Sequence, residues 1–189
     1  AVQLKYENDP VNSFRLLNRL VSLGAWRPAV YTSRQILTCA GLIEDARTLE
    51  APNYFNWIRY GTWFNEIVLK VFDQYKIHQF ILYGLMRQES MYDPWISSSA
   101  GASGLMQIMP ATGLELSKKL QWPPNYADSD LLRATVAINF SAEYLSTQHD
   151  YFGNDNFYML ASYNAGPGST SDWVDKAEND PDLFFEIIR

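Results

Sequence analysis

The sequence predicts an all-α protein, and two observations lead to this fold class. Several separate stretches carry apolar residues at the spacing of an amphipathic helix, with a period of about 3.6 residues. No stretch alternates apolar and polar residues for long enough to predict a β-strand. Glycines and prolines fall between the periodic stretches, where helices start and stop.

Two helices are expected at the start of the chain. The first has an apolar stripe that stops at Gly24 and consists of Leu16, Leu17, Leu20, Val21 and Leu23. The second has Pro28 in its first turn, where a proline costs no helical hydrogen bond, and runs to about Gly41. Short helices with such brief connections are typical of stacked helix pairs.

Two further helices are expected in the middle of the chain. One has a full apolar stripe made of Phe64, Ile67, Val68, Val71, Phe72 and Tyr75. The next carries Leu82, Leu85, Met86 and Glu89 at the spacing i, i+3, i+4, i+7. It should end before Pro94, because the residue that precedes a proline disfavours helix.

The rest of the chain combines helices with longer loops. Ser103 should cap a short helix from Gly104 to Met109, and Pro110 should open the next helix. Residues 121–130 contain two adjacent prolines and should form a loop. A helix should then carry Leu131, Thr135, Ile138, Ala142 and Leu145, with Asp128 or Asp130 as its N-cap and Gly153 beyond its end. Gly166 should stop a later helix.

Length and composition bound the class of protein. The 189 residues suffice for one domain, or for a domain with an appendage, and 47% apolar against 19% charged residues is a globular balance. The net charge of −6 argues against a nucleic-acid partner. A single cysteine, Cys39, excludes an internal disulfide and a cysteine-based zinc site.

The sequence also bears on membranes and export. No run of about 18 apolar residues predicts a membrane span. No basic and apolar leader follows Ala1, so we expect that any signal peptide has been removed. Aromatic residues make up 15%, which fits either a packed core or a groove that stacks on sugar rings.

Glu89 is the first candidate for chemistry. The phosphate-binding, zinc-protease and Cys-x-x-Cys motifs are absent from the sequence, and His78 and His149 lack partners at metal-ligand spacing. Glu89 lies on an apolar stripe near a helix end, where burial without a cation would raise its pKa and suit a general acid. The alternatives are that Glu89 pairs with Arg87 or another cation, or that it faces solvent.

Two later segments could bind a ligand beside this acid. Residues 97–104 are all Ser, Gly or Ala, which let a ligand approach the backbone, although any tight connection between helices also favours such residues. Gln107 offers a donor and an acceptor for a sugar hydroxyl or N-acetyl group. Tyr163 and Asn164 place polar groups near a Gly-Pro-Gly turn.

Three motifs follow one another along the chain: Arg87-Gln88-Glu89-Ser90, the segment GASGLMQIMP at residues 101–110, and YNAGPG at residues 163–168. Taken together and in this order, they resemble the soluble lytic murein transglycosylase family. The resemblance covers residues 77–189 and implies a lysozyme-like catalytic domain that acts on peptidoglycan. Residues 1–76 more loosely resemble the helical superhelix that precedes this domain, so we expect a helical linker over 1–76 and the catalytic domain over 77–189.

The resemblance also implies roles for individual residues. Glu89 corresponds to the catalytic acid, Gln107 and Met109 to groove residues near the sugar, and Tyr163 to the tyrosine that approaches the catalytic carboxyl. Ser98 and Ser103 belong to the loop that lines the cleft, and Asn164 lies close by.

The implied reaction breaks the β-1,4 bond between N-acetylmuramic acid and N-acetylglucosamine without water. It yields 1,6-anhydromuramic products and needs no metal or other cofactor. Peptidoglycan glycan strands would be the partner, and we expect a monomer in the periplasm or cell envelope. Two alternatives stay open: a muramidase-type hydrolase, and a non-catalytic glycan-binding helical module.

The sequence departs from the family pattern in three places. Ala137 and Ser141 stand where the family usually has Asn and Gly, and Ser169 stands where a basic residue often follows the Gly-Pro-Gly turn. The family's Glu-Thr-Arg motif is expected just after Arg189, so the domain should continue past the last residue given.

Overall fold

The fold is built from helices, as predicted. The computed structural model describes residues 5–6, 8–43 and 45–188, so Ala1 and Arg189 lie outside the described residues. Within these ranges the β-structure is limited to isolated bridges that join Ser103 to Ser97 and to Ile108. The all-α prediction is therefore confirmed for the described part of the chain.

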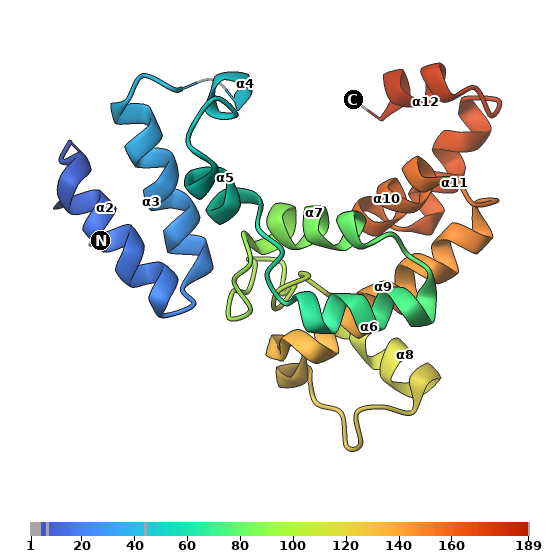
Figure 1. The fold of residues 1–189 in the computed structure, drawn as a ribbon. Coiled ribbons are helices and arrows are strands. Elements are labelled where there is room, and N and C mark those ends of the chain that lie inside the picture. Colours follow the sequence, from blue (N-terminus) through green and yellow to red (C-terminus); the bar gives the residue numbers. More distant parts are fainter. Residues whose placement is uncertain (1–4, 7, 44, 189) are drawn as a thin grey trace.

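The N-terminal helices form one side of the molecule (Figure 1, blue to teal). α2 (Pro10–Ser22) and α3 (Trp26–Cys39) lie side by side, and α5 (Asn53–Tyr60) packs on α3 after the short α4 (Asp45–Thr48). The turn between α2 and α3 contains Gly24 at a φ of +66°. The first two predicted helices and the position of Pro28 in the first turn of α3 are confirmed.

The two helices in the middle of the chain bury apolar residues of the predicted stripes. α6 (Asn65–Tyr75) buries Val68 and Val71, and α7 (Gln79–Ser90) buries its apolar stripe of Leu82, Leu85 and Met86. His78 caps α7, because its Nδ1 accepts a hydrogen bond of 3.3 Å from the backbone N–H of Phe80. The stripe of α7 thus fixes which way Glu89, one turn further on, faces.

The C-terminal part surrounds a long buried helix (Figure 1). Its elements are α8 (Pro110–Leu120), the 3₁₀-helix η1 (Asp128–Leu132), α9 (Ala134–Tyr151), α10 (Asn156–Ala165), α11 (Pro167–Lys176) and α12 (Pro181–Ile187). α9 packs against α6, α8, η1 and α10, and it has fully buried residues on several sides. α10 ends directly before Gly166, which takes a φ of +84°, as expected of a helix stop.

The expected N-cap of the long helix is wrong. Asp128 and Asp130 start the 3₁₀-helix η1, which also contains Leu131, and α9 begins only after Arg133. The Asp130 carboxylate is committed locally: it accepts a hydrogen bond of 3.0 Å from the Ala127 N–H and pairs with Arg133 at 3.0 Å. These contacts stabilise a tight turn before the helix rather than its first turn.

The short helix expected from Gly104 to Met109 is also absent. These residues form a turn that is closed by backbone hydrogen bonds of 3.0 and 3.1 Å between Ser103 and Ile108. Gly104 and Gln107 have φ values of +78° and +48°, which a right-handed helix excludes. Pro110 then opens α8, as predicted.

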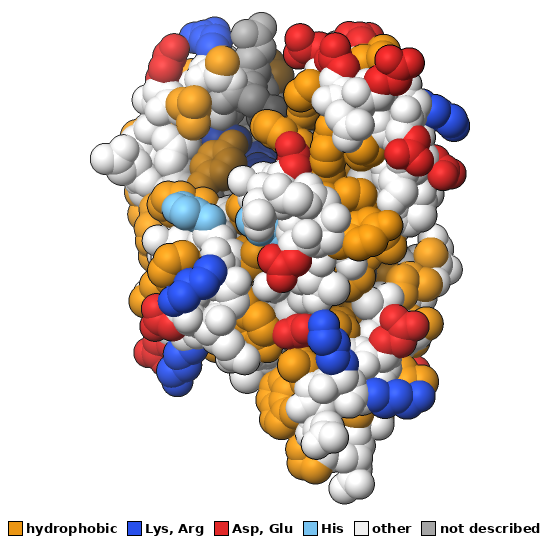
Figure 2. All heavy atoms as spheres, turned by 90° about the vertical axis from the view of Figure 1, so that its right-hand side faces the viewer, with side chains coloured by type: hydrophobic (Ala, Val, Ile, Leu, Met, Phe, Trp, Pro, Cys, Tyr) orange, Lys and Arg blue, Asp and Glu red, His pale blue; other side chains and the backbone are white. Residues whose placement is uncertain are grey.

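One face of the molecule is formed by the C-terminal helices (Figure 2). Acidic side chains gather at the upper right of this view. In the sequence, α11 carries Asp172 and Asp175, and α12 carries Asp182 and Glu186. Hydrophobic side chains lie beside them, including Phe157 and Phe185, whose rings meet at a centroid distance of 5.1 Å. No helix in the described ranges has the length and apolar character that crossing a membrane requires.

Candidate active site

Glu89 lies in the last turn of α7, and its side chain is half-buried. Burial raises the pKa of its carboxyl above the ordinary value of 4.5, and no cation lowers it. The predicted environment of Glu89, a partly buried position on an apolar stripe, is therefore what the structure shows. The alternatives of an ion pair with Arg87 and of full solvent exposure do not hold, since Arg87 donates instead to the backbone oxygen of Arg59 at 3.0 Å.

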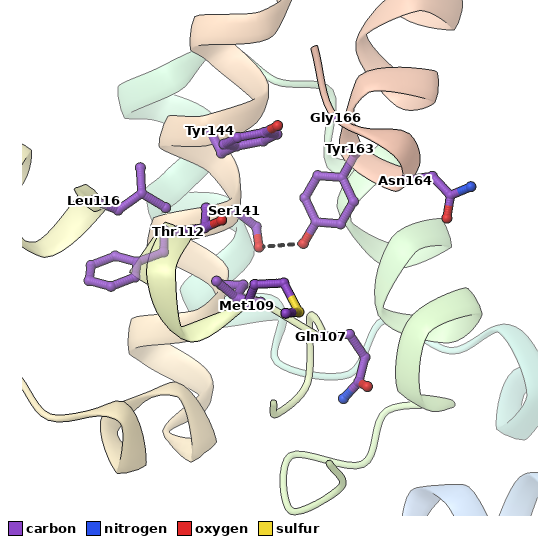
Figure 3. Close-up of a pocket in the computed structure, with 11 residues that line it drawn as sticks. Gln107, Met109, Thr112, Leu116, Ser141, Tyr144, Tyr163, Asn164 and Gly166 are labelled. Atoms are coloured by element: carbon purple, nitrogen blue, oxygen red, sulfur yellow. Dashed lines mark hydrogen bonds between the residues drawn. The ribbon is translucent and has the colours of Figure 1, made fainter. Parts of the chain in front are cut away.

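Two cavities are lined by residues that the sequence predicts for the site. We call the first the Tyr163 cavity: it has a volume of about 200 Å³ and is lined by Gln107, Ile108, Met109, Thr112, Leu116, Phe140, Ser141, Tyr144, Tyr163, Asn164 and Gly166 (Figure 3). We call the second the Glu89 cavity: it has about 150 Å³ and is lined by Arg27, Tyr31, Gln88, Glu89, Ser90, Met91 and Ile96. The predicted acid and the predicted groove residues thus line two separate cavities.

A hydrogen bond between the hydroxyls of Ser141 and Tyr163 links two helices at the Tyr163 cavity (Figure 3). The hydroxyl of Tyr163 donates to the backbone oxygen of Met106 at 2.8 Å and lies 2.8 Å from the hydroxyl of Ser141. The Tyr144 ring meets the Tyr163 ring edge-on at a centroid distance of 5.8 Å. These contacts join α9 and α10 to the turn at residues 104–109.

The Tyr163 hydroxyl lies close to the charge of Glu89. Burial raises the pKa of Tyr163 most strongly, and the negative charge of Glu89 raises it further, while the hydrogen bond with Ser141 lowers it. Tyr163 is therefore a neutral phenol at ordinary pH. It stays a hydrogen-bonding group beside the acid rather than a second ionised one.

The turn at residues 104–109 presents Gln107 and Met109 to the Tyr163 cavity. The Nε2 of Gln107 donates to the backbone oxygens of Gly104 at 2.9 Å and of Ile96 at 3.3 Å. Since no described residue donates to its Oε1, that oxygen is free to accept a hydrogen bond from a ligand. Met109 is 43% exposed, so its thioether can contact a bound ring.

The two predicted loop serines serve the loop itself. The Oγ of Ser98 accepts a hydrogen bond of 3.0 Å from the Ala102 N–H, and Ser103 forms the bridge with Ile108. Neither serine is among the residues that line the Tyr163 cavity or the Glu89 cavity. Ile96, at the start of this loop, joins the two cavities, because it lines the Glu89 cavity and accepts from Gln107.

Most of the residues that line these two cavities were not predicted as site residues. Ser141 and Tyr144 line the Tyr163 cavity, and Arg27 and Tyr31 line the Glu89 cavity. Ser141 was noticeable only as a departure from the family pattern. Arg27 and Tyr31 carry no motif, and only the tertiary fold brings α3 to the end of α7. Among the described residues, no three His, Cys, Asp or Glu side chains lie close enough together to hold a metal ion.

Comparison with known proteins identifies relatives of this chain. The chain is 34% identical over 116 residues to the soluble lytic murein transglycosylase of Escherichia coli strain K12, a match that covers 61% of this chain and 18% of that protein. The chain thus spans less than a fifth of the length of this curated relative.

Solved structures show the same fold. The 70 kDa soluble lytic transglycosylase of Escherichia coli superposes with a TM-score of 0.75 at 26% identity, over 93% of this chain and 26% of that one. An inactive glutamate-to-glutamine mutant of the lytic transglycosylase Slt from Pseudomonas aeruginosa gives a TM-score of 0.68 at 26% identity, over 84% of this chain and 23% of that one.

The family match covers the elements that build both cavities, apart from α3. The transglycosylase SLT domain matches residues 66–183, which include α7 with Glu89, the turn at 104–109 and α10 with Tyr163. The resemblance found in the three sequence motifs is therefore confirmed: this chain belongs to the transglycosylase SLT domain family.

Proposed function

We propose that this chain is the catalytic part of a peptidoglycan lytic transglycosylase. The observation that carries the proposal is the state of Glu89, a half-buried acid with a raised pKa and no cation to hold it ionised. Such a carboxyl keeps its proton closer to neutral pH than a free glutamic acid does, as a general acid must. Membership of a family whose relatives are named lytic murein transglycosylases supplies the substrate class.

In the proposed reaction Glu89 first acts as an acid. It gives its proton to the oxygen that links the anomeric carbon of N-acetylmuramic acid to N-acetylglucosamine, and the bond between that carbon and oxygen breaks. The N-acetyl group of the muramic acid stabilises the positive charge at the anomeric carbon. Glu89, now a carboxylate, then takes the proton of the 6-hydroxyl, whose oxygen closes the 1,6-anhydro ring.

The lining of the cavities favours this route over a two-carboxylate mechanism. Ordinary glycosidases use a pair of carboxyl groups that flank the scissile bond. Among the residues that line the Tyr163 and Glu89 cavities, Glu89 is the single carboxylic acid. A mechanism in which the substrate's own N-acetyl group replaces the second carboxylate fits this composition.

The proposal assigns the other site residues to glycan binding. Gln107 would accept a hydrogen bond through Oε1, Met109 and Asn164 would contact a sugar, and Tyr163 would complete the wall beside Glu89. Ser98 and Ser103 would act through the shape of the loop that they brace. Peptidoglycan is the partner in this proposal, and a monomer in the periplasm or cell envelope is the state that we propose.

Mass spectrometry of the products tests the proposal directly. The protein would be incubated with purified peptidoglycan, and the released muropeptides would be weighed. Products that carry 1,6-anhydromuramic acid, one water lighter than hydrolysis products, support a transglycosylase. Hydrated products would instead make the protein a muramidase-type hydrolase.

A substitution separates an enzyme from a binding module. Glu89→Gln should lower turnover by about 10²–10⁴-fold, the usual contribution of a general acid, while glycan binding persists. Glu66→Gln, an exposed glutamate on α6, is the matched control and should retain full turnover. Glycan binding without any release of products, in the unmodified chain, would point to a non-catalytic glycan-binding helical module.

A further inference from the structure

α3 reaches the candidate active site from outside the family domain. Arg27 and Tyr31 of α3 line the Glu89 cavity, whereas the family match begins at residue 66. The Arg27 guanidinium lies 5.9 Å from the centre of the Tyr31 ring, so the two side chains form one cationic and aromatic surface. The N-terminal helices therefore supply a wall to the cavity that holds the acid.

Arg27 also lines a larger hollow on its other side. This hollow, of about 500 Å³, lies between the α2–α3 turn and the segment that follows α7, and its lining includes Trp26, Asp93 and Trp95. Trp95 is 74% exposed. A ligand that enters the Glu89 cavity thus has room to extend past Arg27.

The charge of Arg27 stands alone in this region. Among the residues that line the Tyr163 cavity, the Glu89 cavity and the larger hollow, Arg27 is the single Lys or Arg. The chain as a whole carries a net charge of −6. A positive group beside the acid is therefore a local feature against the overall charge.

The Arg27 guanidinium has a long-range ion pair with Asp93. Its Nη1 lies 3.8 Å from Oδ2 of Asp93, too far for a hydrogen bond, and it donates no hydrogen bond within the described part of the chain. Asp93 is held in place by the Trp95 N–H, which donates to its Oδ1 at 2.9 Å. Arg27 does not hold Glu89 ionised either, since the pKa of that carboxyl is raised.

We propose that Arg27 binds a carboxylate of the peptide stem that the muramic acid carries, and this inference rests on the proposed function. Sugar rings and N-acetyl groups of the strand are neutral, so its negative charges are the carboxylates of the stem. A guanidinium presents paired N–H donors that match a carboxylate. The muramic acid whose bond is broken beside Glu89 brings its own stem next to Arg27, and the larger hollow receives the rest of the peptide.

Calorimetric binding measurements test the proposal without requiring turnover. Two soluble ligands would be compared, a peptidoglycan disaccharide with its stem peptide and the same disaccharide without the peptide, whose lactyl carboxyl is capped as a neutral amide. Arg27→Gln should weaken binding of the first about tenfold more than binding of the second, the loss expected for one charge-assisted hydrogen bond. Equal effects on both ligands, or no effect on either, would overturn the proposal.

Two further variants sharpen the test. Arg34→Gln changes an exposed arginine of the same helix and should leave both affinities unchanged. Asp93→Asn keeps an oxygen for the Trp95 N–H but removes the charge that competes for Arg27, so it should tighten binding of the stem-bearing ligand. Weaker binding of that ligand by Asp93→Asn would count against the proposal, and circular dichroism would show that each variant is folded.

The outcome is distinguishable from failure of the proposed function. Stem-dependent binding that needs Arg27, in a protein that releases no products, would retain the carboxylate site and reject the lyase. Release of anhydro products with no preference for stem-bearing ligands would retain the lyase and reject the carboxylate site.

Discussion

The hydroxyls of Ser141 and Tyr163 lie 2.8 Å apart, and the direction of this hydrogen bond follows from the Tyr163 proton. A phenol has one proton to donate, and Tyr163 gives it to the backbone oxygen of Met106 at 2.8 Å. Ser141 must therefore be the donor to Tyr163. A hydroxyl that accepts a hydrogen bond becomes a better donor, so Ser141 strengthens the link between Tyr163 and the turn that presents Gln107.

The first prediction concerns Ser141. Ser141→Ala should lower the free energy of unfolding by about 1 kcal/mol, because the hydroxyl of Tyr163 loses its donor. Urea denaturation measures the change. Ser146→Ala removes a hydroxyl from the same helix outside the lining of the Tyr163 cavity and serves as the control. An unchanged unfolding midpoint for Ser141→Ala would show that this bond adds nothing to stability.

Tyr163→Phe should have a larger effect than Ser141→Ala. It leaves the Met106 oxygen and the Ser141 hydroxyl without their partner, which should cost about 1–3 kcal/mol of unfolding free energy. It should also lower turnover, since the turn with Gln107 and Met109 loses its tie to α10. In a double-mutant cycle with Ser141→Ala the two losses should be less than additive, and strict additivity would contradict a coupled chain of hydrogen bonds.

The sequence was sufficient to predict those parts of the site that depend on local pattern. The stripe of α7 predicts that Glu89 is partly buried, because a residue seven positions after Leu82 lies on the same helix face. Gly166 predicts the end of α10, since glycine takes a positive φ without strain. Both features can be predicted because they depend only on residues that are close in the sequence.

The parts that could not be predicted depend on contacts distant in the sequence or on unusual backbone. Ser141 meets Tyr163 from another helix, and Arg27 reaches the Glu89 cavity only because α3 is folded onto the end of α7. The turn at 104–109 replaced an expected helix because Gln107 takes a φ of +48°. Its side-chain amide holds the turn by binding two backbone oxygens, a contact that helix propensity does not anticipate.

The raised pKa of Glu89 predicts how activity depends on pH. The acid must be protonated to donate, so activity should fall as the pH rises through the pKa of Glu89. This fall should occur above the ordinary glutamate value of 4.5, because burial raises the pKa. A profile of kcat/KM against pH measures it, and a fall centred at or below 4.5 would contradict the raised value.

The same pKa predicts how stability depends on pH. A carboxyl whose pKa is raised in the folded state favours folding when it is protonated, and it opposes folding once the pH exceeds the folded pKa. Stability due to Glu89 is therefore highest below the ordinary value of 4.5 and is lost as the pH rises through the raised pKa. Glu89→Gln, which cannot ionise, should raise the melting temperature at pH 8 more than at pH 4.

The control for this effect is Glu66→Gln, because Glu66 is exposed on α6. Glu66 lies in the first turn of α6, where a carboxylate does not oppose folding, so its substitution should give no larger gain in melting temperature at pH 8 than at pH 4. A gain for Glu89→Gln that is equal at pH 4 and pH 8 would show that the carboxyl is not destabilised by its burial.

The last prediction concerns Gly104, which starts the turn beneath the Tyr163 cavity. Its φ is +78°, and a Cβ at this position would overlap the backbone oxygen of Leu131 in η1. Gly104→Ala should therefore lower the free energy of unfolding by about 2–5 kcal/mol, from the left-handed backbone and the overlap together. Gly84→Ala is the matched control, because Gly84 lies inside α7 with no neighbour within 4 Å of an added Cβ. That substitution should stabilise the protein by about 0.5–1 kcal/mol, the usual gain in a helix interior, so thermal denaturation should move in opposite directions for the two alanines. Equal shifts would mean that the turn at Gly104 yields to an added side chain and does not fix the floor of the cavity.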